Sequence, residues 1–165
     1  IAIFVRQPIK VKEEGEVPIF NNPSYQGCGP RHNRILQWAL CDFEGQEFYI
    51  DNIHGLWNGQ GKTDSEERIT QSKAIADFLL QKNGNHILLG DFNLRPDTES
   101  MKIIESRMNN LITQYKIIST RTSLYPKEEK FADYILTSPN LKINTCQVLS
   151  DVVSDHSPIL ADIFC

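Results

Sequence analysis

The stretch HILLGDFNLRPDTES, residues 86–100, decides how the rest of the chain is interpreted. Residues 87–89 have the length of a buried strand, and Gly90 then allows a turn or a close approach of another group. Asp91 and Asn93 follow at a spacing of two, so extended backbone would point both side chains the same way and Phe92 toward the core. The pattern predicts a carboxylate and a carboxamide at the carboxyl end of a strand, where open α/β sheets bind ligands. An Asx-rich turn explains the same letters equally well.

The composition is that of a globular domain. The 165 residues, 40% hydrophobic and 23% charged, fit one domain over residues 1–165. The sequence shows no apolar run of transmembrane length and no signal-peptide pattern. A net charge of −4 gives no general attraction for nucleic acid, although a bound metal can supply positive charge locally. The four cysteines form no C-x-x-C pair, so free thiols are expected at Cys28, Cys41, Cys146 and Cys165.

The first residue is Ile1 rather than Met, and residues 1–11 read like the middle of a strand. We therefore expect coding sequence upstream of residue 1. A targeting segment could belong to that sequence, so the location of the protein in the cell is left open, with the cytoplasm as the starting assumption.

The first half of the chain predicts a parallel crossover unit. Residues 1–11 are expected to form one strand, in which Pro8 indicates an edge position or a bulge, and residues 12–31 a surface loop. Residues 34–42 and 47–53 predict a hairpin around the turn 43–46. A capping box at 63–66 begins a helix that ends at 83–84, and a strand follows. Because parallel strands of such a unit end at the same edge of a sheet, His54 should face Asp91. A lone histidine at a strand end is, however, more often structural than catalytic.

The second half predicts a short helix and three more strands. Asp97 or Thr98 is expected to cap the helix, with Met101, Ile104 and Met108 in the core. The strands are expected over residues 131–136, 143–149 and 159–164. Asp133 lies inside the first of them and needs a partner, because burying an unpaired charge is costly.

Polar residues gather at the predicted strand ends: His54, Asp91, Asn93, Asp133, Asp155 and His156. In the local sequences NIHG, LLGDFN, FADYIL and SDHSPI, they resemble the endonuclease/exonuclease/phosphatase superfamily with its DNase I-like fold. The resemblance covers residues from about 34 to 165. It implies a four-layered α/β sandwich that is incomplete at its N-terminus, with this chain forming the C-terminal two-thirds of a single domain.

The resemblance also implies roles for these residues. Asp91 and Asn93 would bind the nucleophile and the phosphate side, and Asp155 would help to hold a divalent metal. His54 and His156 would contact the phosphoryl group, and Asp133 would orient His156. Carboxylate and carboxamide oxygens suit Mg²⁺ or Mn²⁺ rather than zinc, so the expected cofactor is Mg²⁺ or Mn²⁺. Its expected ligands are Asp91, Asn93 and Asp155, and Asp91 is also placed to take a proton from water.

Two departures from the family pattern matter. The pattern includes an upstream Asn and a metal-binding Glu, and no residue of this chain matches either of them. We therefore expect the 165 residues alone to be poorly active, and a preceding segment of roughly ninety residues to restore metal-dependent activity. The abasic-site endonucleases of the superfamily carry a tyrosine where this chain has His54. The chain therefore resembles the DNase I, sphingomyelinase and phosphatase side more closely.

The sequence thus predicts a Mg²⁺-dependent phosphoesterase that cleaves a phosphodiester by attack of water. We place a nuclease slightly ahead of a lipid or inositol-phosphate hydrolase. The alternative from another class is a non-catalytic binding or scaffold domain that keeps the fold. The expected partner is a phosphodiester substrate, with nucleic acid among the candidates, and the expected assembly state is a monomer. Substrate-binding candidates, several of which could equally be solvated loop residues, are Asn93, Arg95, Trp57, Asn58, Arg121 and Tyr125.

Overall fold

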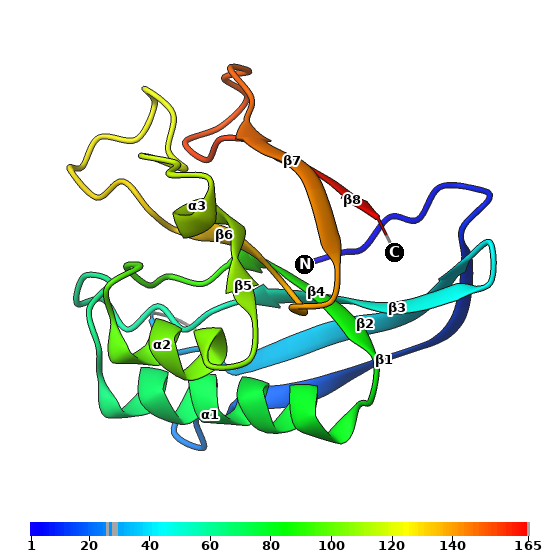
Figure 1. Ribbon diagram of the computed structural model, residues 1–165. Helices are drawn as coiled ribbons and strands as arrows, with labels where there is room; N and C mark the ends of the chain where they lie inside the picture. The colour runs from blue at the N-terminus through cyan, green and yellow to red at the C-terminus, as the bar shows by residue number, and fades with distance from the viewer. Residues whose placement is uncertain (26, 28–29, 165) are drawn as a thin grey trace.

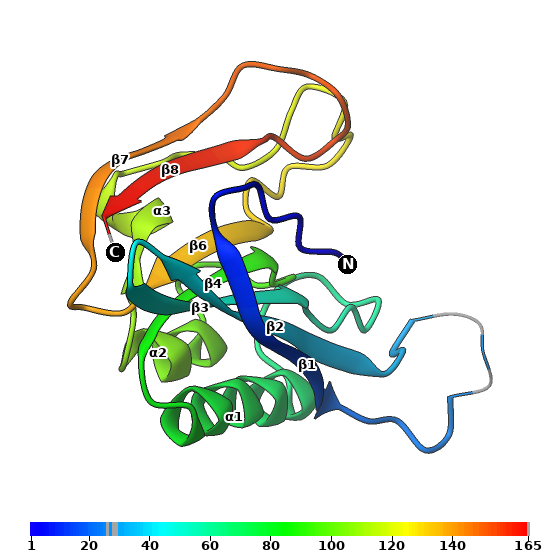
Figure 2. The same cartoon turned by 90° about the vertical axis from the view of Figure 1, so that its right-hand side faces the viewer.

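The computed structural model describes residues 1–25, 27 and 30–164 and has an α/β architecture (Figure 1). Its elements are β1 (Lys10–Phe20), β2 (Arg34–Phe43), β3 (Gln46–His54), α1 (Glu66–Gln81), β4 (Asn85–Asp91), α2 (Glu99–Glu105), β5 (Asn109–Asn110), α3 (Leu111–Gln114), β6 (Asp133–Thr137), β7 (Lys142–Val148) and β8 (Ile159–Phe164). A six-stranded sheet has the order β1-β2-β3-β4-β6-β5, and β7 and β8 form a second sheet. Helices α1 and α2 cover one face of the large sheet, and the β7–β8 pair lies over the other (Figures 1 and 2). The predicted α/β sandwich is confirmed.

The hairpin of β2 and β3 forms as predicted. The two strands pair antiparallel from Leu36 opposite Ile53 to Phe43 opposite Gln46. The turn consists of Glu44 and Gly45, whose φ angles are 53° and 84°. Two consecutive positive φ angles are typical of the hairpin turn whose twist matches that of the flanking strands.

The crossover unit of β3, α1 and β4 also forms, and its two strands are parallel. Ile75 and Phe78 of α1 pack onto the sheet in the same cluster as Leu88 of β4. The helix begins later than the capping box predicts, because Ser65 rather than Thr63 is the N-cap. The neighbouring Asp64 instead accepts hydrogen bonds from the first turn of α2, which joins the two helices.

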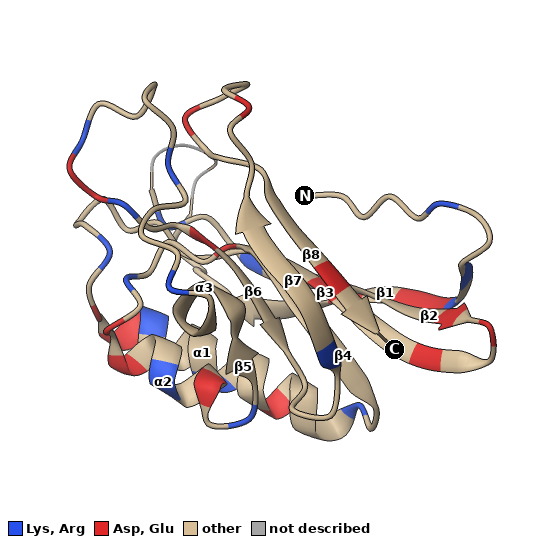
Figure 3. Cartoon of the chain, turned by 45° about the horizontal axis from the view of Figure 1, so that its top comes forward, with Lys and Arg blue, Asp and Glu red and all other residues tan. Residues whose placement is uncertain are grey.

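The N-terminal region differs from its prediction. Residues 1–9 are not in a strand, and Lys10–Phe20 forms β1 where a loop is expected over residues 12–31. Gly15, Val17 and Ile19 face inward while Glu14 and Glu16 face solvent, which is the alternation of a half-buried strand. Acidic residues along β1 (Figure 3) suit its position at the edge of the sheet, where charge discourages pairing with other chains. This charged composition is also typical of a loop, so the sequence was misleading here.

In the second half of the chain, the ends of the observed strands lie within one or two residues of the predicted ends. Strand β5 and helix α3 were not predicted. Thr98 caps α2, and Met101, Ile104 and Met108 are buried. Cys41 and Cys146 are buried, while Cys28 and Cys165 lie outside the described residues. Within the described part of the chain, none of the helices is long and apolar enough to cross a membrane.

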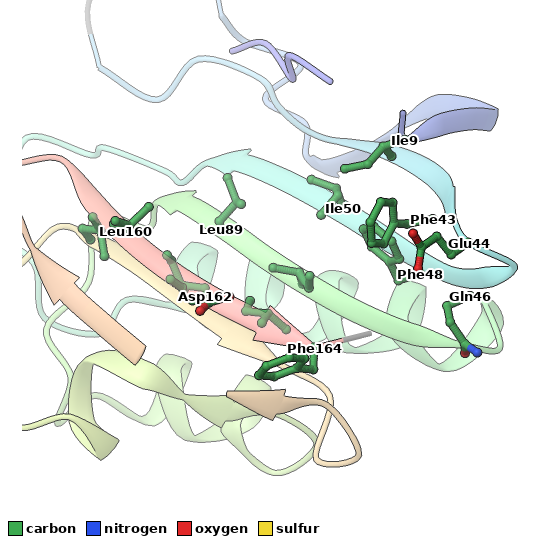
Figure 4. A pocket seen from close by; sticks show the side chains of 15 residues that line it. Ile9, Phe43, Glu44, Gln46, Phe48, Ile50, Leu89, Leu160, Asp162 and Phe164 are labelled. Carbon is green, nitrogen blue, oxygen red and sulfur yellow. The ribbon is translucent and has the colours of Figure 1, made fainter. Parts of the chain in front are cut away.

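Two apolar layers lie on either side of the large sheet. One fills the space between the sheet and helices α1 and α2. The other lies between the large sheet and the β7–β8 pair, and it is incomplete. A groove of about 900 Å³ opens there, and its lining includes Ile50 and Leu89 of the large sheet and Leu160 and Phe164 of β8 (Figure 4). The candidate site lies on this same face of the sheet.

Candidate active site

Three polar residues form a row across neighbouring strands of the large sheet. His54 of β3 lies opposite Asp91 of β4, and Asp91 lies opposite Asp133 of β6. Ile135 and Leu89, two residues from Asp133 and Asp91 on the same strands, line the apolar groove. Because side chains two apart on a strand share a face, the row faces the β7–β8 pair. The predicted meeting of His54 and Asp91 is therefore confirmed, with Nε2 of His54 3.8 Å from Oδ2 of Asp91.

His156 reaches this row from the loop between β7 and β8. Its Nδ1 lies 2.7 Å from Oδ2 of Asp133. The loop is fixed by backbone pairing with the segment before β6, in which Ser157 N–H donates to the carbonyl of Thr120 at 3.0 Å. Since a carboxylate accepts, Nδ1 of His156 donates, and Nε2 is left facing two other carboxylates. The Oδ2 atoms of Asp91 and Asp155 lie 4.0 and 3.9 Å from it.

The chain turns sharply after Asp91. Strand β4 ends there, and Asn93 has a φ of 53°. The Asn93 N–H donates to Oδ1 of Asp91 at 2.8 Å, which is an Asx turn, and the Asn93 carboxamide donates to the carbonyl of Gly55 at 3.2 Å. The expectation that Asp91 and Asn93 lie in extended backbone, with their side chains pointing the same way, is therefore wrong. Phe92 does point into the core, where it is 1% exposed. Residues 91–93 therefore form an Asx turn, and the same residues also belong to the candidate site.

The same turn requires a glycine at position 55. The Gly55 N–H donates to the Asp91 carbonyl, and a Cβ atom at Gly55 would lie 2.2 Å from the carbonyl oxygen of Phe92. This contact holds the ends of β3 and β4 together, so that His54 and Asp91 stay in register. Gly90 is close-packed for the same reason, because a Cβ there would lie 2.0 Å from the Ile53 carbonyl oxygen.

Burial and charge set the protonation of the row. Burial, followed by the charge of Asp91, raises the pKa of Asp133, while His156 acts in the opposite direction. Burial, followed by the charge of Arg34, lowers the pKa of His54, against the attraction of Asp91. His54 is therefore favoured as the neutral imidazole, which keeps one ring nitrogen as an acceptor.

Lys62 is a site residue that sequence reasoning missed. It is 3% exposed, and its Nζ donates to the carbonyl of Phe131 at 2.8 Å. Burial lowers its pKa to about 8, although Asp91 and Asp133 act to raise it. Its own carbonyl accepts from the Arg95 N–H at 2.9 Å, so Lys62 joins three loops around the site. The glycine-rich sequence before Lys62 contains no signal that separates it from a solvent-exposed lysine.

Two of the predicted substrate-binding residues lie beside the site. Arg121 donates to Oδ2 of Asp155 at 3.0 Å, and its guanidinium lies 4.0 Å from the ring centroid of Tyr125. A backbone bridge also pairs Arg121 with His156. Arg121 and Tyr125 are therefore connected to the site through Asp155 and His156.

The other predicted residues have partners of their own. Arg95 donates to Glu129 at 2.7 Å. Asn58 is buried, and its side-chain oxygen accepts the Gln60 N–H at 3.0 Å, as in a loop-stabilising Asx turn. The ring of Trp57 faces the ammonium of Lys127 at 5.8 Å. These contacts do not link the three residues directly to the row.

The residues present fit a divalent cation. Ligand atoms of Asp91, Asp133 and His156 all lie within 4.8 Å of one another. Two of these are carboxylates, the ligands that hard cations prefer, and the Asp155 carboxylate lies beside them. The carboxamide oxygen of Asn93 forms no hydrogen bond with a described residue, so it is available as a further ligand. The cluster overlaps the predicted ligand set of Asp91, Asn93 and Asp155 at Asp91.

A protein-family model and several solved structures match this chain. A model of the endonuclease/exonuclease/phosphatase family matches residues 1–156. No curated protein matches the chain in sequence. Among solved structures, a mannosyl-6-phosphatase of Bacteroides thetaiotaomicron superposes with a TM-score of 0.74 and 21% identity, over 95% of this chain and 67% of that one.

Two animal proteins superpose similarly. Zebrafish (D. rerio) TDP2 in complex with a single-stranded DNA product gives a TM-score of 0.70 at 19% identity, over 95% of this chain and 69% of that one. The catalytic domain of human Nocturnin with a bound sulfate gives 0.68 at 20% identity, over 98% and 62%. The chain therefore spans about two thirds of the length of the structures it matches. At these identities the superpositions show a shared fold.

Proposed function

Because the chain belongs to the endonuclease/exonuclease/phosphatase family, whose members are hydrolases of phosphoesters, we propose that it hydrolyses a phosphodiester by direct attack of water, with Mg²⁺ or Mn²⁺ as cofactor. The observation that carries the proposal is the placement of the His156–Asp133 pair beside Asp91. Side chains from distant parts of the chain meet on one face of the sheet, namely those of His54, Asp91, Asp133 and His156. Stability of the fold does not require these polar groups to lie together.

Asp91 is the proposed general base. Its Oδ1 is occupied by the Asn93 N–H, so Oδ2 is the atom available to a reactant. Oδ2 lies 3.8 Å from His54 and 4.0 Å from His156, which is too far for a hydrogen bond but leaves each group free to bond a reactant oxygen. Asp91 takes a proton from the attacking water, and the neighbouring imidazoles hold the phosphoryl oxygens.

His156 is the proposed donor to the phosphoryl group. Asp133 holds its Nδ1, which fixes both the tautomer and the orientation of the ring. In its imidazolium form the ring carries a second proton, on Nε2, and this N–H is the proposed donor to the oxygen on which negative charge grows as water attacks. Asn93 holds Gly55 and the turn after Asp91, and His54 takes the opposite side of the phosphoryl group.

Asp91, Asp155 and Asn93 are the proposed metal ligands, with Asp133 and His156 beside them. A divalent cation bound there supplies positive charge that polarises the phosphate and stabilises the leaving oxygen. The acidic net charge of the chain makes this local positive charge necessary for binding an anion.

For the substrate, we propose a nucleic-acid phosphodiester ahead of a lipid or inositol phosphate. Tyr125 stacked on Arg121 beside Asp155 offers an aromatic face and a cation, the two groups that bind a base and its phosphate. Zebrafish TDP2 holds a single-stranded DNA product, whereas the bacterial neighbour is a mannosyl-6-phosphatase, so the fold serves nucleic-acid and other phosphoester substrates. A non-catalytic domain is the alternative of another class.

Hydrolysis of bis(p-nitrophenyl) phosphate, with Mg²⁺ and with chelator, tests the function. We expect turnover that is slow in the 165 residues alone and that chelator removes, and losses of at least a hundredfold in Asp91→Ala and His156→Ala. Asp151→Ala is the matched control, since that aspartate is exposed in the same loop as Asp155. Wild-type rates in both site variants would refute the assignment. A panel of plasmid DNA, single-stranded DNA, RNA and phospholipid then separates the substrate classes.

A further inference from the structure

The sequence contains two Asn-Gly pairs, Asn58-Gly59 and Asn83-Gly84. In such a pair the backbone nitrogen of the glycine can attack the side-chain carbonyl carbon of the asparagine, because glycine has no Cβ to hinder the approach. The attack requires an asparagine side chain that is free to turn toward that nitrogen and a site that water can reach. The fold meets these requirements in one pair and not in the other.

Asn83 lies in the short connection between α1 and β4. Asn83 and Gly84 are both exposed. Among the described residues, none forms a hydrogen bond with the Asn83 carboxamide or with the Gly84 N–H. The nucleophile and the carbon that it attacks are therefore both free of partners and open to water.

Asn58 provides a comparison within the same chain. Its side chain is 8% exposed, and its carboxamide oxygen accepts the Gln60 N–H at 3.0 Å. Ring closure onto the Gly59 nitrogen would move that oxygen and break the bond, inside a loop where the side chain has little room. We therefore expect the folded chain to protect Asn58, although its local sequence is as reactive as that of Asn83.

We propose that Asn83 is a site of spontaneous deamidation. The Gly84 nitrogen bonds to the side-chain carbonyl carbon of Asn83, and the bond from that carbon to the amide nitrogen breaks. The amide group leaves as ammonia together with the proton of the Gly84 N–H, and a five-membered succinimide remains. Water then adds to one of the two ring carbonyl carbons. Opening at one carbon gives aspartate, and opening at the other gives isoaspartate, whose main chain runs through the former side chain.

Both products change the junction between α1 and β4. They place a negative charge at the C-terminus of α1, where the helix dipole makes negative charge unfavourable. Isoaspartate also lengthens the main chain between two fixed points. One is the Lys82 carbonyl, which accepts from His86 at 2.8 Å, and the other is Asn85, which pairs with Phe48 of β3. We therefore expect the modified chain to be less stable than the unmodified one.

Tandem mass spectrometry of protease digests tests the proposal on the 165-residue chain. After incubation at pH 8 and 37 °C, we expect conversion at Asn83 to be at least tenfold faster than at Asn58. The same incubation in urea is the matched control. Unfolding removes the difference in burial and bonding, so the two rates should then agree within about threefold. Conversion in the folded chain that is no faster at Asn83 than at Asn58 would overturn the proposal. A rate at Asn83 that rises tenfold or more on unfolding would also overturn it.

Asn83→Gln separates deamidation from other changes during the incubation, because glutamine would have to close a six-membered ring and reacts much more slowly. By differential scanning fluorimetry we expect the Tm of wild type to fall during the incubation and that of Asn83→Gln to stay constant. Asn83→Asp should show part of the fall from the start, since it carries the charge without the longer main chain. A fall as large in Asn83→Gln as in wild type would refute the effect of this modification on stability.

Discussion

His156 Nδ1 and Asp133 Oδ2 lie 2.7 Å apart, although 23 positions separate the two residues in the sequence. Asp133 begins β6 of the large sheet, whereas His156 lies in the loop between β7 and β8. The contact exists because the segment before β6 and the loop before β8 are joined by backbone hydrogen bonds through Thr120 and Thr122. Thr120 also accepts the N–H groups of Ala132 and Asp133 with its hydroxyl. The orientation of the imidazole is therefore set by the backbone on both sides.

Replacing Asp133 by Asn should lower kcat about a hundredfold while leaving the fold intact, because an amide no longer fixes the tautomer and charge of His156. Steady-state hydrolysis of bis(p-nitrophenyl) phosphate measures the effect. The control is Asp162→Asn on β8, whose carboxylate accepts from Asn144 away from the site. A kcat within twofold of wild type would contradict a positioning role for Asp133.

Lys62→Met should loosen the site, because the bond to Phe131, two residues before Asp133, is lost. We expect kcat to fall about tenfold. A second readout is the free energy of unfolding, measured with urea between pH 7.5 and 10. The pKa of Lys62 is lower in the folded state, so the unfolded chain binds the extra proton and wild-type stability rises as the pH passes above about 8. The Met variant should lack this rise. An identical pH dependence in both proteins would show that the lysine is not buried as a charge.

The buried His86–Asp51 pair should make stability depend on pH in the opposite direction. His86 Nδ1 lies 2.7 Å from Asp51, and its Nε2 donates to the Lys82 carbonyl. Burial raises the pKa of Asp51. For His86, burial acts to lower the pKa, but the bond and charge of Asp51 outweigh it and the pKa is raised.

Because both pKa values lie above their unfolded values, the folded protein holds the extra proton. The stabilisation from His86 is therefore complete below about pH 6.5 and is lost as the pH rises through its folded pKa. Urea unfolding of wild type at pH 6 and 8.5 should show this decline, and His86→Gln should not. Asp51→Asn should cost about 3 kcal/mol at pH 6, because it leaves the imidazolium unpaired. Equal slopes for wild type and His86→Gln would exclude the pair as the cause.

Metal should stabilise the folded chain through Asp91. Binding at a hundred times the Kd contributes about 2.7 kcal/mol, so saturating Mg²⁺ or Mn²⁺ should raise the Tm by several degrees. Asp91→Asn should show little of this rise, and Asp151→Asn should show all of it, because Asp151 is exposed. Differential scanning fluorimetry with and without chelator measures these shifts. An undiminished rise in Asp91→Asn would place the cation elsewhere.

The sequence predicted the relation of His54 to Asp91 because a strand–helix–strand unit leaves its two strands few other arrangements. The relation of Asp133 to His156 required the family resemblance, since nothing local shows which loop covers β6. Strand β1 was missed because the charges of a solvent-facing edge are also those of a loop. Lys62 was missed for another reason, namely that its ammonium bonds to the carbonyl of Phe131, which is far away in the sequence.

The row of His54, Asp91 and Asp133 makes activity a readout of how the strands are aligned. Neighbouring residues of a strand point to opposite faces, so a slip of one residue in β4 would turn Asp91 into the helical layer and bring Leu88 out. Such a molecule would be inert rather than partly active. Titrating the active fraction of a preparation therefore counts correctly paired sheets, which spectroscopic measures of secondary structure do not distinguish.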